Sequence, residues 1–207
     1  MKRHSYFRGV TTPGEYNMSF IFSLWACVAP GLTTMDEPVN VGKKPEVVQG
    51  PYWDECSFNG GDHICDLVLP TADGGEERLY DHYGEVIVID VSAMWCGPCQ
   101  QAASQVNSIQ VMTGGVKWIT VLVENLDGED PTIEDGQQWG DYFGIWHDEI
   151  WLGSRMYDID VTGTYGFPLT GWPFFAILDR DLRIRVVKQG WNKDEMLLHI
   201  AELKTEP

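Results

Sequence analysis

The sequence predicts an α/β domain in which helices flank a mixed sheet of four or five strands. Residues 85–91 and 116–125 are nearly continuous apolar runs rich in β-branched side chains, which is typical of strands buried on both faces. Between them, apolar residues recur at three- and four-residue steps, which indicates a helix packed on the sheet. Strand, helix and strand joined by short links form a βαβ unit, whose crossover is expected to be right-handed.

This helix is expected to begin after Cys96 and to end at the glycine pair Gly114 and Gly115, because glycine commonly terminates helices. The stripe that would face the sheet consists of Cys99, Ala102, Ala103, Val106 and Ile109.

The next segment begins with an acidic loop at residues 127–135. The order of its carboxylates does not match an EF-hand, so a solvated loop with a helix cap is favoured over a calcium site. Residues 133–147 are predicted to form a helix with a core-facing aromatic stripe. That stripe consists of Trp139, Phe143 and Trp146. Residues 149–170 are expected to be irregular.

The C-terminal part of the chain predicts two strands and a helix. Residues 172–191 favour two strands around a turn near Arg180 and Asp181. Residues 193–204 have the pattern of an amphipathic helix. Its inward-facing residues are expected to be Met196, Leu197, Ile200 and Leu203.

The length and charge of the chain limit its class and partners. With 207 residues the chain suits one domain with a substantial core. The formal net charge is −17, and such a surface repels phosphate backbones, so nucleic acid is not an expected partner. Solubility is the simplest account of the acidity, and steering of a basic partner protein is the alternative.

The N-terminus has the pattern of an export signal. Lys2, Arg3 and Arg8 precede an apolar run at residues 18–30, which is too short to span a bilayer as a mature helix but fits a secretory signal. An unusual cytosolic N-terminus is the alternative. The predicted organisation is a leader at 1–30, a tether at 31–50 that contains prolines and charges, and a domain at 51–207.

Cys27 is the candidate lipidation site. It ends the stretch LWAC, which resembles a bacterial lipobox, and a cut after Ala29 is the alternative. A multiply acylated Cys27 would anchor the protein firmly to a membrane. Lipidation would also leave four of the five cysteines, which form two local pairs.

The first local pair, Cys56 and Cys65, brackets an Asn-Gly-Gly turn signal. In an exported protein this arrangement predicts a hairpin-like loop closed by a structural disulfide. A metal site that includes His63 is the competing interpretation, but it needs more ligands than this stretch offers.

The second pair, Cys96 and Cys99 in WCGPC, has three interpretations. A structural zinc site needs four ligands, and the chain has no second Cys-x-x-C. A structural disulfide gains little by closing so short a loop. A redox pair is favoured, because a cysteine at a helix N-terminus faces unpaired N–H groups that stabilise its thiolate and lower its pKa from about 8.5 to roughly 3.5–7.5.

In the redox interpretation Cys96 is the thiolate and is expected to be reachable from solvent. Cys99, one turn further on, would attack the mixed disulfide and release the product. Pro98 fits the first helical turn, where a missing N–H costs no hydrogen bond.

Residues 89–100, IDVSAMWCGPCQ, resemble the active-site stretch of thioredoxins, and the exported setting resembles the membrane-tethered TlpA/ResA-type branch. The resemblance covers about residues 65–204. It implies a thioredoxin fold with an N-terminal extension and an insertion before the cis-proline strand. It also implies that Cys96 attacks, that Cys99 resolves, and that Asp90 accepts the proton of Cys99. A buried Asp90 would have the raised pKa that suits this task, whereas an Asp90 that points to water is the alternative.

The resemblance also implies a cis-proline at Pro173, beside the cysteines. The substrate would then contact this turn and the active-site loop. The predicted contact residues are Trp95, Gly97, Pro98, Trp172 and Pro173, although Trp172 packed against Trp95 is an alternative role.

The chain departs from plain thioredoxin in two respects. The lysine that neighbours the buried acid there has no match here, where Val123 or Glu124 stands. The region between the second strand and Pro173 is also longer, and it is a candidate partner-selecting surface.

The predicted function is that of a thiol–disulfide oxidoreductase, more as reductant than as oxidant, since Gly-Pro between the cysteines resembles the reducing members. Its expected substrates are cysteines of envelope proteins, with the haem-attachment cysteines of apocytochromes in cytochrome c maturation as one option. A membrane protein would donate the electrons, and no cofactor or metal is expected. A copper carrier on the same fold, with His147 or His199 as an added ligand, is the alternative, and a peroxidase is a weaker one.

Overall fold

A computed structural model of the chain describes residue 53 and residues 55–206, which all belong to one compact unit. The predicted leader, the tether and Cys27 lie outside the described residues. The elements are, in order, β1 (Val68–Pro70), β2 (Glu76–Arg78), η1 (Leu79–His82), β3 (Ile87–Ala93), α1 (Gly97–Ala103), α2 (Val106–Met112), β4 (Lys117–Glu124), α3 (Ile133–Phe143), η2 (His147–Glu149), β5 (Ile150–Leu152), α4 (Arg155–Asp158), β6 (Phe174–Leu178), β7 (Ile184–Gln189) and α5 (Lys193–Thr205).

The main sheet has five strands in the order β5-β4-β3-β6-β7. The central strand β3 pairs parallel with β4 and antiparallel with β6, so the sheet is mixed. β1 and β2 form a separate antiparallel hairpin. The predicted fold class, a mixed sheet of four or five strands flanked by helices, is confirmed.

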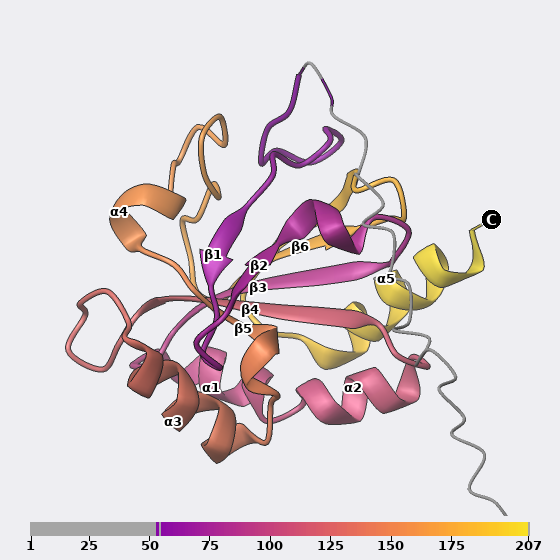
Figure 1. Cartoon of the computed structure of the whole chain (residues 1–207). Helices are drawn as coiled ribbons and strands as arrows, with labels where there is room; N and C mark the ends of the chain where they lie inside the picture. The colour runs from indigo at the N-terminus through magenta and orange to yellow at the C-terminus, as the bar shows by residue number, and fades with distance from the viewer. Residues whose placement is uncertain (1–52, 54, 207) are drawn as a thin grey trace, which may run out of the picture. The chain divides into compact units, whose positions relative to one another are not determined.

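Apolar residues cover both faces of this sheet, which is why β3 and β4 are almost continuously apolar. On one face Val88, Trp118 and Phe175 pack against helices, and Figure 1 shows α1, α2 and α3 together along this side. On the other face, Ile87 and Ile89 pack against residues that precede β1, such as Phe58. The domain therefore has two cores, with β3 buried between them.

The helix predicted after Cys96 is interrupted, because α1 ends at Ala103 and α2 begins at Val106. At the break the hydroxyl of Ser104 donates to the carbonyl of Gln101, and such local bonds compete with the helical ladder. The stripe nevertheless holds, because its members on both pieces are buried. The predicted stop is confirmed. Gly114 and Gly115 have left-handed φ values, and their N–H groups donate to Val111 and Gln110 in the pattern of a Schellman motif.

The predicted aromatic helix is shorter than expected. α3 begins at a capping box formed by Thr132 and Asp135, but Gly144, with φ 73°, ends it. Trp139 is buried, whereas Trp146 lies beyond the helix and is 73% exposed. The expectation that Trp146 belongs to the core stripe is wrong, because the chain leaves the helical path before it.

Residues 149–170 are more regular than predicted, since they contain β5 and α4. β5 has only three residues and pairs parallel with β4 at the edge of the sheet. A three-residue strand is too short to show a period in the sequence. The C-terminal predictions are confirmed, with β6 and β7 around the turn at Arg180 and Asp181, and with α5 after them.

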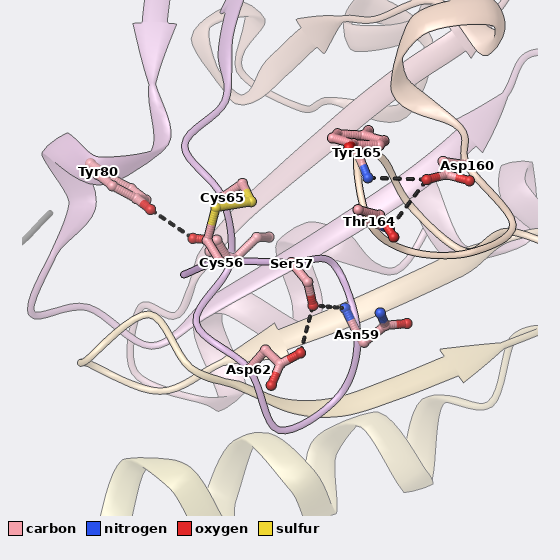
Figure 2. The surroundings of a disulfide bond; sticks show 10 residues. Cys56, Ser57, Asn59, Asp62, Cys65, Tyr80, Asp160, Thr164 and Tyr165 are labelled. Carbon is pink, nitrogen blue, oxygen red and sulfur yellow. Dashed lines mark hydrogen bonds between the residues drawn. A yellow bond between two sulfur atoms is a disulfide. The ribbon is translucent and has the colours of Figure 1, made fainter. Parts of the chain in front are cut away.

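The structure places a disulfide between Cys56 and Cys65, and the loop that it closes packs on residues 160–165 (Figure 2). The backbone N–H of Phe58 donates to the carbonyl of Gly163 at 2.7 Å, and the side-chain amide of Asn59 donates to the carbonyl of Thr162. Within the loop, the Ser57 hydroxyl donates to Asp62. The disulfide loop therefore supports part of the insertion before β6.

We expect Gly163→Ala to lower the free energy of unfolding by about 1–3 kcal/mol. Gly163 has φ 69°, and a Cβ there would lie 2.3 Å from Oδ1 of Asn59. Urea unfolding followed by circular dichroism measures the effect. Gly61→Ala is the matched control, since Gly61 also has a positive φ but a Cβ there meets nothing within 4 Å. Equal losses in the two variants would contradict the predicted steric clash.

Candidate active site

Cys96 and Cys99 lie where β3 passes into α1, and they form a disulfide with their Cα atoms 5.2 Å apart. β3 ends at Ala93, whose carbonyl accepts the N–H of Cys96. Cys96 is the N-cap of α1, so Cys99 stands in the first turn of the helix. The pair thus bridges the end of a buried strand and the start of a helix.

The Sγ atom of Cys96 accepts a hydrogen bond from the N–H of Cys99 at 3.2 Å. This N–H is one of the donors that a helix N-terminus leaves without an intrahelical partner. Pro98 has no N–H to leave unpaired in the same turn. The geometry can therefore stabilise negative charge on the sulfur of Cys96.

Cys96 is less accessible than predicted. In the disulfide form it is 3% exposed, and Cys99 is 0% exposed. The expectation of a freely reachable Cys96 sulfur is wrong for this form. The reason is that Cys96 belongs to the buried core cluster on the helix-covered face of the sheet, whereas its chain neighbours Trp95, Gly97 and Pro98 are exposed.

Asp90 is fully buried in the middle of β3, between Thr120 of β4 and Phe175 of β6. The Ser92 hydroxyl donates to its Oδ1 atom at 2.6 Å. Its Oδ2 atom and the indole N–H of Trp118 are buried without a hydrogen bond of normal geometry. Asp90 lies on the helix-covered face, because strand residues two apart share a face and Val88 belongs to that core.

Burial raises the pKa of Asp90 to about 7, although the Ser92 hydroxyl and the nearby Trp118 indole oppose the shift. A carboxyl group with this pKa can exchange a proton near neutral pH. The alternative of an Asp90 that points to water does not hold in this structure.

Pro173 follows a cis peptide bond and directly precedes β6. The next residue, Phe174, pairs with Val91 of β3, so the turn lies at the same end of the sheet as the cysteines. Trp172 meets Trp95 edge to face, with ring centroids 5.6 Å apart. The structure therefore brings together two predicted contact residues from distant parts of the sequence.

Glu124 and Arg155 also belong to this region, although the sequence did not mark them as site residues. Glu124, at the end of β4, is 5% exposed. Its carboxylate accepts the indole N–H of Trp95 and a guanidinium N–H of Arg155, each at 2.7 Å. In the sequence, the only indication that Glu124 is a site residue was a charged residue at the carboxyl end of an otherwise apolar strand. Nothing in the sequence around Arg155 indicates that it lies at the site.

The predicted histidine candidates lie in separate surroundings. His63 stacks on Trp53 at 4.0 Å, and burial lowers its pKa. Nε2 of His147 lies 3.0 Å from the carboxylate of Asp141, and His199 lies near Glu195 and Glu202. Among residues 53 and 55–206, no group of three or more His, Cys, Asp and Glu side chains could hold a metal ion.

No family model matches the chain. Solved structures are similar to it in fold. A protein of Chlorobium tepidum described as a thiol:disulfide interchange protein DsbE is 23% identical, with a TM-score of 0.53 over 72% of this chain and 98% of that one. The thioredoxin domain of a thiol-disulfide oxidoreductase from Bacteroides vulgatus is 15% identical, with a TM-score of 0.56 over 70% and 98%.

The domain has the thioredoxin fold. A secreted disulfide oxidoreductase of Mycobacterium tuberculosis is also similar to it in structure, with 13% identity and a TM-score of 0.50 over 66% of this chain and 96% of that one. Within this thioredoxin fold, the cysteine pair lies at the β3–α1 junction and the cis-proline precedes β6. Within the described part of the chain, no helix is long and apolar enough to cross a bilayer.

Proposed function

We propose that the protein is a thiol–disulfide oxidoreductase that uses Cys96 and Cys99 to reduce disulfides in other proteins. The observation that carries this proposal is the Cys96–Cys99 disulfide at the start of α1, where the N–H of Cys99 donates to Cys96. A disulfide there closes a very short loop and therefore stabilises the fold little, so we assign it a redox role in which it is reversibly formed and reduced.

The reduced protein begins the reaction with Cys96 as thiolate. This thiolate attacks one sulfur of a substrate disulfide, a mixed disulfide forms, and the other substrate sulfur leaves as a thiolate that takes up a proton. Asp90 then accepts the proton of Cys99, for which a pKa of about 7 is suitable. The Cys99 thiolate attacks Cys96, the Cys96–Cys99 disulfide forms, and the second substrate sulfur leaves as a thiolate that takes up a proton. Asp90 then releases the proton that it accepted, which returns it to the ionised form.

Each cycle passes two electrons to the substrate, so a donor must reduce the Cys96–Cys99 disulfide again. We assign this role to a membrane electron donor. Trp95, Gly97, Pro98, Trp172 and Pro173 are the proposed substrate contacts. Their support is that Trp95, Gly97 and Pro98 are exposed beside Cys96 and that Trp172 touches Trp95.

The proposed location is the outer side of a bacterial cell membrane, with a lipid on Cys27 as anchor and envelope proteins as substrates. The leader pattern and the Cys56–Cys65 disulfide support export, because structural disulfides persist in oxidising compartments. Mass spectrometry of envelope-purified protein should find a chain that begins at Cys27 and carries lipid. An unmodified Met1 would contradict this location.

Insulin reduction with dithiothreitol as donor tests the activity. Cys96→Ser should lower turnover at least about 10³-fold, because it removes the attacking sulfur. In a separate incubation without dithiothreitol, reduced Cys99→Ser should instead accumulate a mixed disulfide between Cys96 and the substrate, and added dithiothreitol should release it. Substantial turnover in Cys96→Ser would remove Cys96 from its role.

The reduction potential of the pair tests the direction. A reductant should lie closer to the about −270 mV of thioredoxin than to the about −120 mV of a strong disulfide oxidant. A potential near the oxidising value would reverse the proposed direction, and tight copper binding without turnover would favour a copper carrier instead.

A further inference from the structure

We propose that Glu124 and Arg155 are positioning residues that hold Trp95 and Trp172 at the entrance to Cys96, so that the insertion before β6 forms part of the active site. This inference rests on the proposed redox function and adds to it how the substrate entrance is built. The four side chains come from the end of β4, the residue before Cys96, the start of α4 and the residue before the cis-proline.

The first link is the carboxylate of Glu124. A buried carboxylate is costly unless it is paired and hydrogen-bonded. Oε2 of Glu124 accepts the Trp95 indole N–H and Oε1 accepts the Arg155 guanidinium, both at 2.7 Å, so each oxygen has one donor. The indole of Trp95, the residue next to Cys96, is thereby fixed in its orientation.

The second link is the guanidinium of Arg155, which also lies 6.0 Å from the ring centroid of Trp172. At this distance a cation is attracted to the face of an indole ring. Trp172 in turn meets the ring of Trp95 edge to face. The contacts therefore form a closed ring, from Glu124 to Trp95, to Trp172, to Arg155 and back to Glu124.

Arg155 is held in place by the backbone on which it stands. The N–H of Gly153 donates to the carbonyl of Leu122 in β4 at 2.9 Å, and the N–H of Ser154 donates to Asp158 at 2.6 Å. A Cβ at Gly153 would lie 2.8 Å from Asp158 and 3.0 Å from Val121, so the chain passes β4 too closely for a larger residue. The start of α4 is thus fixed against the strand that carries Glu124.

The charges of the pair give the proposal a specific signature. Glu124 and Arg155 neutralise each other beside the residue that precedes Cys96. Glu124→Gln leaves a positive charge there, which favours the Cys96 thiolate, and Arg155→Gln leaves a negative charge, which disfavours it. If the two residues contributed only to stability, the two variants would not shift the pKa of the Cys96 thiol in opposite directions.

The test measures the pH at which alkylation of reduced Cys96 by iodoacetamide is half-maximal, with Cys99 replaced by serine in every protein. We expect Glu124→Gln to move this pH down and Arg155→Gln to move it up. Arg185→Gln is the matched control, because Arg185 also forms ion pairs, with Asp179 and Glu206, but stands on β7 away from the ring of contacts. It should leave the alkylation pH unchanged.

Steady-state kinetics of insulin reduction, with both cysteines present, test the positioning. Arg155→Gln should raise KM by about fivefold or more, since misplaced tryptophans fit the substrate less well. Arg155→Lys keeps the charge, so its alkylation pH should equal that of the unaltered protein. Its KM should lie between those of the unaltered protein and Arg155→Gln. An alkylation pH that moves the same way in Glu124→Gln and Arg155→Gln, or in neither, would overturn the proposal. Absence of turnover in the unaltered protein would overturn the proposed function instead, while the alkylation profiles would still decide the positioning role.

Discussion

Asp90→Asn should raise the free energy of unfolding at pH 8 by up to about 4 kcal/mol. Asp90 is fully buried, and burial raises its pKa from 3.8 to about 7. An ionised carboxylate therefore destabilises the folded state relative to the unfolded state. Asparagine has nearly the same shape and carries no charge at any pH, so the variant avoids this cost.

The sign of the pH dependence follows from the raised pKa. Below about pH 4 Asp90 is protonated in both states, so it does not lower the stability of the folded state. As the pH rises towards 7, the unfolded state releases the proton of Asp90 before the folded state does, so the contribution of Asp90 to stability falls. Above pH 7 the loss is complete. The variant should lack this fall between pH 4 and 7.

Urea unfolding of the oxidised protein at pH 5, 6, 7 and 8 measures this effect. Asp160→Asn is a suitable control, because hydrogen bonds from Thr162 and neighbouring N–H groups lower the pKa of Asp160 to about 2. Its charge state is constant over that range, so the slope with pH should remain. Parallel slopes in the unaltered protein and in Asp90→Asn would show that Asp90 does not titrate as described.

Removal of the Cys56–Cys65 disulfide, in a Cys56→Ala/Cys65→Ala variant, should lower the free energy of unfolding by about 2–3 kcal/mol. The two cysteines are nine positions apart, and the bond restricts the unfolded chain by closing that loop. The folded loop also holds residues 160–165 through hydrogen bonds from Phe58 and Asn59. Residues 160–165 should therefore become more mobile when the disulfide is removed.

Guanidinium unfolding and hydrogen exchange of the amides at residues 160–165 measure these two effects. Ser57→Ala is the matched control, because it removes the bond to Asp62 but keeps the disulfide. It should cost at most about 1 kcal/mol. If the double variant unfolded at the same denaturant concentration as the unaltered protein, the disulfide would have no structural role.

Much of the fold was predictable from the sequence because its signals are local. Continuous apolar runs marked β3 and β4, and the Gly114–Gly115 pair marked the end of α2. Where the signal is short or is broken by a turn, the prediction failed. β5 has three residues, and Gly144 turns the chain before Trp146 can continue the aromatic stripe.

The sequence by itself determined which residues are candidates for chemistry, because Cys96, Cys99 and their helix start are neighbours along the chain. Only the tertiary structure decided what surrounds them. Trp95 and Glu124 are 29 positions apart and Glu124 and Arg155 are 31 apart, so no local pattern records their bonds. The burial of Cys96 in the core on the helix-covered face of the sheet likewise depends on tertiary packing. Burial and pairing depend on which distant segments meet, and this is settled only when the whole chain has folded.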